Sequence, residues 1–319
     1  MTQTNGPAPS PCFWAPQSAE GMARARAKRP DGELRLSFSQ KDVPGPAGLQ
    51  PETVLTGRYR RGNSHISSRM VTGEDEQPYY YVLASGGGLT EGERYTARYE
   101  VTPGCHAAVT TNAGTYVLKC PHGELTSQDI RIEVGEGASF EFYQDDVIPF
   151  ATAVYRLDCQ VELARGARLL LSEGVSKGWT EDGSGFGFAD LGLHTQVRRE
   201  GLLVANDYQL LMPGSEPMSG LGYFEGYAVL RQVTVVDEAV GGDTVELERA
   251  AIGAACSELG KKEAIWGVSL LGGGGMALRV LGARHDQAAR VVDAFVRCYR
   301  EDVCGWRPLR LRKSSEQGR

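Results

Sequence analysis

The sequence EVGEGASFEF, at residues 133–142, describes a strand, a glycine turn and a second strand within ten residues. An acidic and an apolar residue are followed by a two-residue spacer, Gly137, a small residue and another apolar run. Glycine adopts positive φ at little cost, so the chain can reverse or turn a corner there. The arrangement recurs at residues 100–109 around Gly104 and 162–171 around Gly166, with a weaker copy at 197–204 around Gly201.

These glycines are 29 to 35 residues apart, a spacing typical of supersecondary units stacked on one another. In residues 155–163 the odd-numbered positions are apolar and the even-numbered ones polar or charged, which indicates a half-buried strand. Two architectures fit. The units form an antiparallel sandwich if the glycines close hairpins, and a β-helix-like solenoid if they form corners. The periodicity alone leaves both open.

Helices are predicted only late in the chain. Residues 286–300 place Ala289, Val292 and Phe295 on one apolar face, and residues 243–259 form a second candidate. Between these two segments, residues 266–280 predict two strands around four consecutive glycines.

The composition is that of a soluble globular protein, with 41% hydrophobic and 23% charged residues among 319. No stretch approaches the roughly 18 apolar residues of a membrane helix, and the N-terminus lacks the layout of a secretory signal. Seven scattered cysteines indicate reduced thiols. We therefore expect a cytoplasmic protein without a membrane partner.

Charge is distributed unevenly along the chain. The net charge is −6, of which residues 1–30 contribute +3 and residues 307–319 contribute +4, so the body between them carries −13. An acidic body argues against nucleic acid as a partner; it fits cation handling, a basic partner, or simple solubility. We divide the chain into a disordered N-terminal extension (1–32), a single β-rich domain that includes the C-terminal helices (33–306) and a basic tail (307–319).

Two groups of residues are candidates for acid/base catalysis or metal binding. Asp145 and Asp146 stand near Glu141 like an acid/base pair, but adjacent strand residues point to opposite faces, and a solvated strand end is the simpler interpretation. Cys120 and His122, with the Cys-His pair at 105–106, offer thiolate and imidazole groups suited to zinc, nickel or copper; the alternative is ordinary turn residues. The residues alone show no catalytic constellation.

A series of motifs runs through residues 33–298. They are GGGLTEGE (86–93), VTPG (101–104), TTNAGT (110–115), QDDVIPF (144–150), GARLLLSE (166–173), GW (178–179), LGYFEGY (221–227) and GVSL (267–270). Their order and spacing resemble the urease accessory protein D family (UreD, also called UreH), in its Gram-positive branch. Many members have a Gly-Arg pair after the glutamate matched by Glu173. This chain has SKGW at 176–179 instead, so no role of that arginine is carried over.

The resemblance implies a mainly β fold, with β-helix-like stacked sheets and two α-helices toward the C-terminus, in which the glycines are corners. It also implies a non-enzymatic urease-maturation chaperone. Such a scaffold docks on apo-urease and binds accessory protein F and, through it, the GTPase accessory protein G. Nickel would pass from that GTPase to urease through an internal conduit, so Ni²⁺ is expected as a transient ligand and no tightly bound cofactor is expected.

A conduit for nickel needs water and carboxylates that bind weakly enough to release the ion. The candidates within the matching strands are Asp145, Asp146, Asp158, Glu173 and Asp207; for each, surface solubilisation is the alternative. Two other functions remain open. One is a β-solenoid carbohydrate-active enzyme that uses Asp145 and Glu141 on one face, and the other is an interaction scaffold unrelated to nickel.

Overall fold

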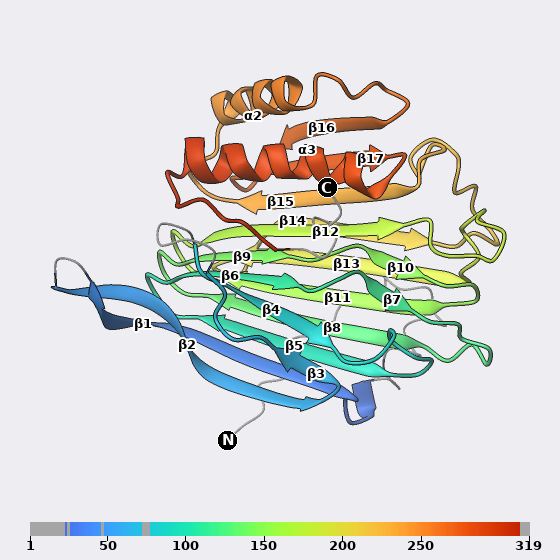
Figure 1. Cartoon of the computed structure of the whole chain (residues 1–319), viewed down its shortest axis with the longest axis horizontal. Helices are drawn as coiled ribbons and strands as arrows, with labels where there is room; N and C mark the ends of the chain where they lie inside the picture. The colour runs from blue at the N-terminus through green and yellow to red at the C-terminus, as the bar shows by residue number, and fades with distance from the viewer. Residues whose placement is uncertain (1–22, 24–25, 46–47, 72–76, 313–319) are drawn as a thin grey trace.

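The computed structural model describes residue 23 and residues 26–45, 48–71 and 77–312. Two β-sheets lie face to face, and two α-helices cover the outer side of one of them (Figure 1). Sheet A has seven strands in the order β14-β13-β11-β8-β5-β1-β2. These are β1 (Gly32–Gly45), β2 (Gly48–Gly62), β5 (Arg94–Val101), β8 (Thr126–Val134), β11 (Val154–Leu163), β13 (Asp190–Arg199) and β14 (Leu202–Leu211).

Sheet B follows the order β16-β17-β15-β12-β9-β6-β4-β3, with β7 and β10 beside this path. Its strands are β3 (Ser64–Ile66), β4 (Tyr79–Ala84), β6 (His106–Thr111), β7 (Thr115–Val117), β9 (Ser139–Tyr143), β10 (Val147–Pro149), β12 (Arg168–Ser176), β15 (Val229–Val236), β16 (Ala264–Leu270) and β17 (Met276–Gly282).

The middle of the chain winds as stacked coils. It passes from β5 to β6, from β8 to β9 and from β11 to β12, crossing from sheet A to sheet B each time. Within each sheet the strands of successive coils pair in parallel, as β5 with β8 and β6 with β9 do. The arrangement is β-solenoid-like, as the resemblance implied, and the mainly β fold class is confirmed.

Three of the four repeated glycines form the corners of these coils. Gly104, Gly137 and Gly166 have φ of 71°, 63° and 65°, a region that L side chains rarely adopt. The corners stack, since the amide of Gly104 donates to Glu136 O at 3.0 Å in the next coil. The weaker copy differs: Gly201 closes an antiparallel hairpin between β13 and β14 within sheet A. The solenoid alternative is therefore right for three copies and the hairpin alternative for the fourth.

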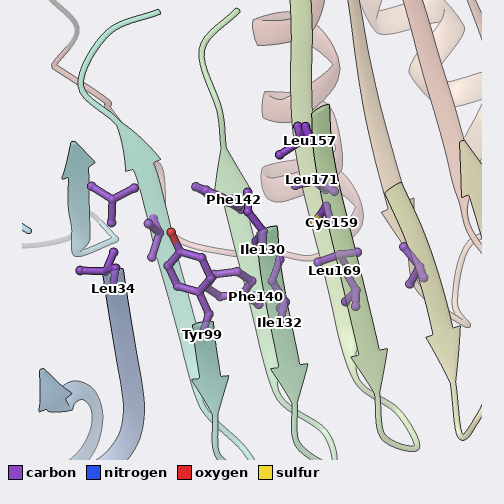
Figure 2. Close-up of a cluster of buried hydrophobic side chains, with 14 of the residues drawn as sticks. Leu34, Tyr99, Ile130, Ile132, Phe140, Phe142, Leu157, Cys159, Leu169 and Leu171 are labelled. Atoms are coloured by element: carbon purple, nitrogen blue, oxygen red, sulfur yellow. The ribbon is translucent and has the colours of Figure 1, made fainter. Parts of the chain in front are cut away.

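The main core fills the space between the sheets. Inward-facing side chains alternate along each strand, as Ile130 and Ile132 do on β8 and Phe140 and Phe142 on β9 (Figure 2). All four are at most 2% exposed. Burial of each such side chain contributes about 1.5–3 kcal/mol, so the stacked coils are held together chiefly by this double row of apolar residues.

A second core lies on the outer side of sheet B. Helix α2 (Gly242–Ala255) and helix α3 (His285–Arg297) cover it, and α3 continues into a π-helical turn, η2 (Cys298–Val303). Phe295 packs there with Val233 and Leu278. Both predicted helices and both strands around the glycines at 272–275 are confirmed, although α2 ends at Ala255, four residues before the predicted end. Among the described residues, no helix is long and apolar enough to cross a lipid bilayer.

Both ends of the described chain are held by the body. The expectation of disorder for residues 1–32 falls mostly outside the described residues, but Arg26 contacts sheet A, as detailed below. At the other end, the first part of the basic tail runs along β4. There Gln77 N donates to Pro308 O at 2.9 Å and Arg312 N donates to Tyr79 Oη at 3.0 Å.

Candidate functional site

The space between the sheets changes from apolar to polar at one end. On β12, Leu169 and Leu171 face the core, and Glu173 follows on the same face because side chains alternate along a strand. A cavity opens beside it between β12 and β15 of sheet B and β13 and β14 of sheet A. Its volume of about 20 Å³ holds roughly one water molecule or small cation. We call it the inner cavity; its polar lining consists of Gln144, Asp145, Glu173, Thr195, Asp207, Gln209 and Gln232.

Glu173 is the central acid of the inner cavity. Its Oε1 accepts a hydrogen bond from Thr195 Oγ1 at 2.8 Å and its Oε2 accepts one from Gln232 Nε2 at 3.1 Å. Burial raises the pKa of Glu173 to about 7, the nearby Asp207 carboxylate adds to the rise, and the two hydrogen bonds only partly oppose it. The side chain therefore exchanges a proton near neutral pH.

Asp207 lies across the cavity on β14. Gln232 Nε2 donates to both Asp207 Oδ2, at 3.0 Å, and Glu173 Oε2, so one amide connects the two carboxylates. Gln209 Nε2 donates to the same Asp207 oxygen at 3.0 Å, and Arg279 forms an ion pair with Oδ1. This network holds Asp207 beside Glu173, with the charge of Asp207 balanced by Arg279.

Asp145 supplies the third carboxylate. It lies in the connection between β9 and β10, and its Oδ2 accepts a hydrogen bond from Thr111 Oγ1 at 2.8 Å. Thr111 also lines a second cavity of about 300 Å³, under the glycine-rich loop at residues 86–88 and beside Tyr95 and Gln128. The threonine thus lies between the second cavity, which it lines, and Asp145 of the inner cavity.

Several polar groups in this region are unsatisfied by the described protein. Gln144 Nε2 and Gln209 Oε1 are buried without a hydrogen-bond partner among the described atoms, and both residues line the inner cavity. Buried polar groups of this kind normally bind a partner, so the inner cavity suits a small polar occupant such as a water molecule. Cys159 feels the charge of Glu173 and is fully buried, and burial holds the pKa of its thiol well above the ordinary value, so it is a protonated neighbour and not a thiolate ligand.

Asp146 does not line the inner cavity. It follows Asp145 but points to the outer side of sheet B, where Arg231 Nε lies at 2.7 Å and His285 Nδ1 at 2.6 Å from its carboxylate. Burial alone would raise its pKa, but the hydrogen bond from His285 and the charge of Arg231 lower it. Gly174 makes room for this carboxylate, since a Cβ there would lie 2.0 Å from Asp146 Oδ1. The interpretation of Asp146 as a solvated strand end is wrong, because it is only 2% exposed.

Asp158 also lies away from the cavity. It alternates with the inward-facing Leu157 and Cys159 and therefore points to the outer side of sheet A. It contacts Arg26, Arg131, Gln160 and His194. Of the five predicted conduit acids, the structure brings together Asp145, Glu173 and Asp207 and separates Asp146 and Asp158 from them.

Glu141 cannot act together with Asp145 on one substrate bond, because it lies under η2 on the outer side of sheet B. His106 Nε2 lies 2.5 Å from its Oε1, and Arg300 and Tyr143 also bind this carboxylate. The sheet separates it from the inner cavity, so the acid pair that a carbohydrate-active enzyme would need is not formed by these residues.

Cys120 and His122 face different surroundings. The Cys120 thiol is buried, contacts Thr126, and has a pKa raised by burial. The His122 ring is at the surface, where Nδ1 lies 2.9 Å from Glu91 Oε2. Within the described ranges, no group of three or more His, Cys, Asp or Glu side chains is arranged to hold a metal ion.

Reasoning from sequence missed the neutral members of the inner cavity. Thr195 and Gln232 position Glu173, and Gln209 positions Asp207. They come from strands that are distant in sequence, and polar residues in alternating strands normally mark the solvent face. Only the assembled sheets reveal them, with Gln232 beside Glu173 on the neighbouring strand of sheet B and Thr195 and Gln209 facing it from sheet A.

Comparison with known proteins places this geometry in context. A sequence model of the family described as "UreD urease accessory protein" matches residues 30–315. A urease accessory protein UreD of Streptococcus salivarius (strain 57.I) is 31% identical over 284 residues, covering 89% of this chain and 97% of that protein. One from Arthrobacter sp. (strain FB24) is 30% identical over 305 residues, covering 93% and 98%. One from Actinomyces naeslundii is 31% identical over 252 residues, covering 79% and 87%.

Proposed function

Because this chain belongs to the UreD family of urease accessory proteins, we propose that it is a non-catalytic scaffold for nickel insertion into urease. Family membership supports a role in urease maturation. The finer parts of the proposal are that the protein connects apo-urease with accessory proteins F and G, and that Ni²⁺ passes through it as cargo.

The inner cavity is the observation that carries the nickel part of the proposal. Three carboxylates, Asp145, Glu173 and Asp207, border a water-sized space inside an otherwise apolar interior. Carboxylate and amide oxygens hold a divalent cation more weakly than thiolates do, and the nearby Cys159 stays protonated. A cation can therefore enter, exchange ligands and leave, which a transfer route requires and a storage site does not.

Glu173 gives the route an adjustable charge. Its protonated side chain is neutral, and its ionised side chain adds a negative charge beside Asp207. Release of the proton and entry of a cation therefore favour each other. The larger cavity next to Thr111 would provide a hydrated approach to this point. Under this proposal the carboxylates act one after another along a path and not as a single closed cage.

The proposal is tested by isosteric substitution of the lining acids. Glu173→Gln and Asp145→Asn are expected to lower the nickel content and specific activity of urease at limiting nickel, while urease still co-purifies with the variant. Glu181→Gln is the matched control, because that side chain is 79% exposed and lies outside the cavity. Full nickel loading by stably folded Glu173→Gln and Asp145→Asn variants would contradict the route.

The scaffold role is tested separately. Deletion of the gene at matched nickel supply should leave urease abundant but inactive, and the intact gene should restore its activity. Unchanged activity per unit of urease in the deletion would contradict a role in maturation. Loss of activity without any effect of the cavity variants would retain the scaffold and reject the route.

A further inference from the structure

Two aspartates lie side by side on the outer face of sheet A, away from the inner cavity. Asp129 on β8 and Asp158 on β11 are register partners in the parallel ladder, and they are only 7% and 0% exposed. Like charges directly opposite on neighbouring strands are destabilising, and burial increases that cost. Such a pair needs cationic hydrogen-bond donors around it.

Arg26 meets this requirement from outside the sheet. Its Nη2 lies 2.7 Å from Asp158 Oδ2 and 3.1 Å from Asp129 Oδ1, and its Nε lies 3.2 Å from the same Asp129 oxygen. The two carboxylates are 103 and 132 residues further along the chain. One guanidinium therefore bridges two strands of the solenoid, and its side chain retains 26% exposure.

The sheet positions both carboxylates independently of Arg26. His194 Nδ1 at 3.0 Å and Gln160 Nε2 at 2.7 Å hold Asp158 Oδ1, while Oδ2 faces Arg26 at 2.7 Å and, at the longer distance of 3.4 Å, Arg131. Arg94 Nη2 holds Asp129 Oδ2 at 2.9 Å, which leaves Oδ1 directed at Arg26. In each aspartate, the sheet binds one oxygen firmly and presents the other.

His194 is itself fixed in this role. It is 1% exposed, and its second nitrogen, Nε2, lies 3.0 Å from Asn206 Oδ1. Gln196 Nε2 donates to that same oxygen, which identifies it as an acceptor, so both ring nitrogens of His194 donate. Asp158 thus rests on a hydrogen-bonded support that spans β11, β13 and β14.

The charges around the two aspartates determine which kind of cation they bind. Arg94 beside Asp129, Arg131 at 3.4 Å from Asp158 and the doubly protonated His194 already place positive charges next to the carboxylates. These charges repel a divalent metal ion more strongly than a guanidinium, whose single charge is delocalised. A guanidinium presents several donors in a planar fork and can reach two acceptors at once, whereas a lysine ammonium is a compact point charge. The geometry fits arginine.

We propose that Asp129, Asp158 and His194 form an arginine-binding socket, in which the N-terminal segment of this chain is a resident and exchangeable ligand. The class of ligand is a basic peptide segment that presents arginine. Arg26 and Ala27 are helical, and the residues after them are fastened by Arg94 Nη1 to Lys28 O at 3.1 Å and by Arg61 to Pro30 O. When Arg26 leaves, the socket becomes available to an arginine of another protein.

The test uses the full chain with the socket emptied by Arg26→Gln. A fluorescein-labelled peptide of residues 20–31 is titrated into the wild-type chain and into this variant, with fluorescence anisotropy as the readout. The peptide should bind the variant at least about tenfold more tightly than the wild type, whose socket is occupied. Two variants of the peptide with equal charge are then compared. Arg26→Gln removes the arginine that enters the socket, and the matched control, Arg29→Gln, removes an arginine that is exposed.

Two further variants locate the binding. Asp129→Asn and Asp158→Asn, each in the Arg26→Gln chain, should weaken peptide binding by about tenfold or more, because each removes a charge-assisted hydrogen-bond acceptor. Circular dichroism confirms folding; Asp129, at the edge of the cluster, remains informative if Asp158→Asn is unstable. Three results would overturn the proposal. These are equal binding to the wild type and the emptied chain, equal binding by the Arg26→Gln and Arg29→Gln peptides, and no binding to the emptied chain at all.

Discussion

Arg300→Met should destabilise this protein strongly, because it leaves a buried glutamate without its main counter-ion. Arg300 and Glu141 are 2% and 0% exposed and form an ion pair beneath η2. Arg300 also binds Arg307 O and lies 5.6 Å from the ring centre of Trp306, so it fastens the C-terminal segment to sheet B. Methionine keeps much of the side-chain volume and removes the charge and the hydrogen bonds.

The pKa of Glu141 sets the magnitude. Burial alone would raise it, but the charge of Arg300 and the hydrogen bond with His106 outweigh burial and lower it from 4.5 to about 2. Since a tenfold change in proton affinity corresponds to about 1.4 kcal/mol, the surroundings of Glu141, burial included, favour its ionised form by a net of about 3 kcal/mol. This agrees with the loss of about 3–5 kcal/mol that follows removal of one partner from a buried pair.

The sign of the pH dependence follows from the same shift. Because the pKa of Glu141 is lower in the folded state, this stabilisation is complete above about pH 4.5 and is lost as the pH falls toward 2. The difference in free energy of unfolding between wild type and Arg300→Met should therefore be about 3 kcal/mol at pH 7. It should shrink as the pH falls, because burial raises the pKa of the orphaned glutamate, which then becomes protonated.

Urea denaturation at several pH values measures both quantities. Arg165→Met is the control, because its ion pair with Glu136 is 73% and 59% exposed and should contribute at most about 1 kcal/mol. A double variant, Arg300→Met with Glu141→Gln, should be more stable than Arg300→Met alone, since no buried charge remains. A loss below about 1 kcal/mol at pH 7, or a loss independent of pH, would refute this reasoning.

Two other predictions follow from the corners and from the inner cavity. Gly137→Ala should cost only about 1–2 kcal/mol of backbone strain, because φ is 63° and a Cβ there meets no heavy atom within 4 Å. Gly174→Ala should cost more, because its Cβ would displace Asp146; equal losses in urea denaturation would contradict this contrast. Because the pKa of Glu173 is higher in the folded state, at about 7, wild type should lose stability as pH rises from 4.5 to 7, and Glu173→Gln should lose less. Superimposable melting temperatures against pH for the two proteins would reject the buried, protonated glutamate.

The sequence was sufficient to locate the turns but not their geometry. Gly137 and Gly201 follow the same local pattern, yet Gly137 leads from sheet A to sheet B and Gly201 reverses within sheet A. Both glycines have positive φ, 63° and 78°, so backbone conformation at the turn does not distinguish them. The difference lies in the next strand: β9 finds parallel partners in sheet B, whereas β14 pairs antiparallel with β13. Such long-range pairing leaves no local signature.

The position of some acids could have been deduced from alternation. Asp158 alternates with Leu157 and Cys159, so the sequence alone assigns it to the outer face. The prediction that it lines an internal conduit was inconsistent with this alternation. Glu173 has the parity of Leu169 and Leu171 and belongs inside by the same rule. Asp207 could not be assigned this way, because β14 begins with Leu202 and Leu203, which are 75% and 51% exposed, and its apolar residues do not alternate.

Alternation also explains how one strand serves two sites. On β13, Thr195 points inward and donates to Glu173, while its neighbour His194 points outward and supports Asp158. The backbone of a single strand separates the cavity from the arginine socket, and the acids of each are neutralised by different partners. Their chemistry differs accordingly, since the inner acids surround a space for a small polar occupant and the outer acids hold a guanidinium. The nickel route and the exchange of the N-terminal segment can therefore be accepted or rejected independently.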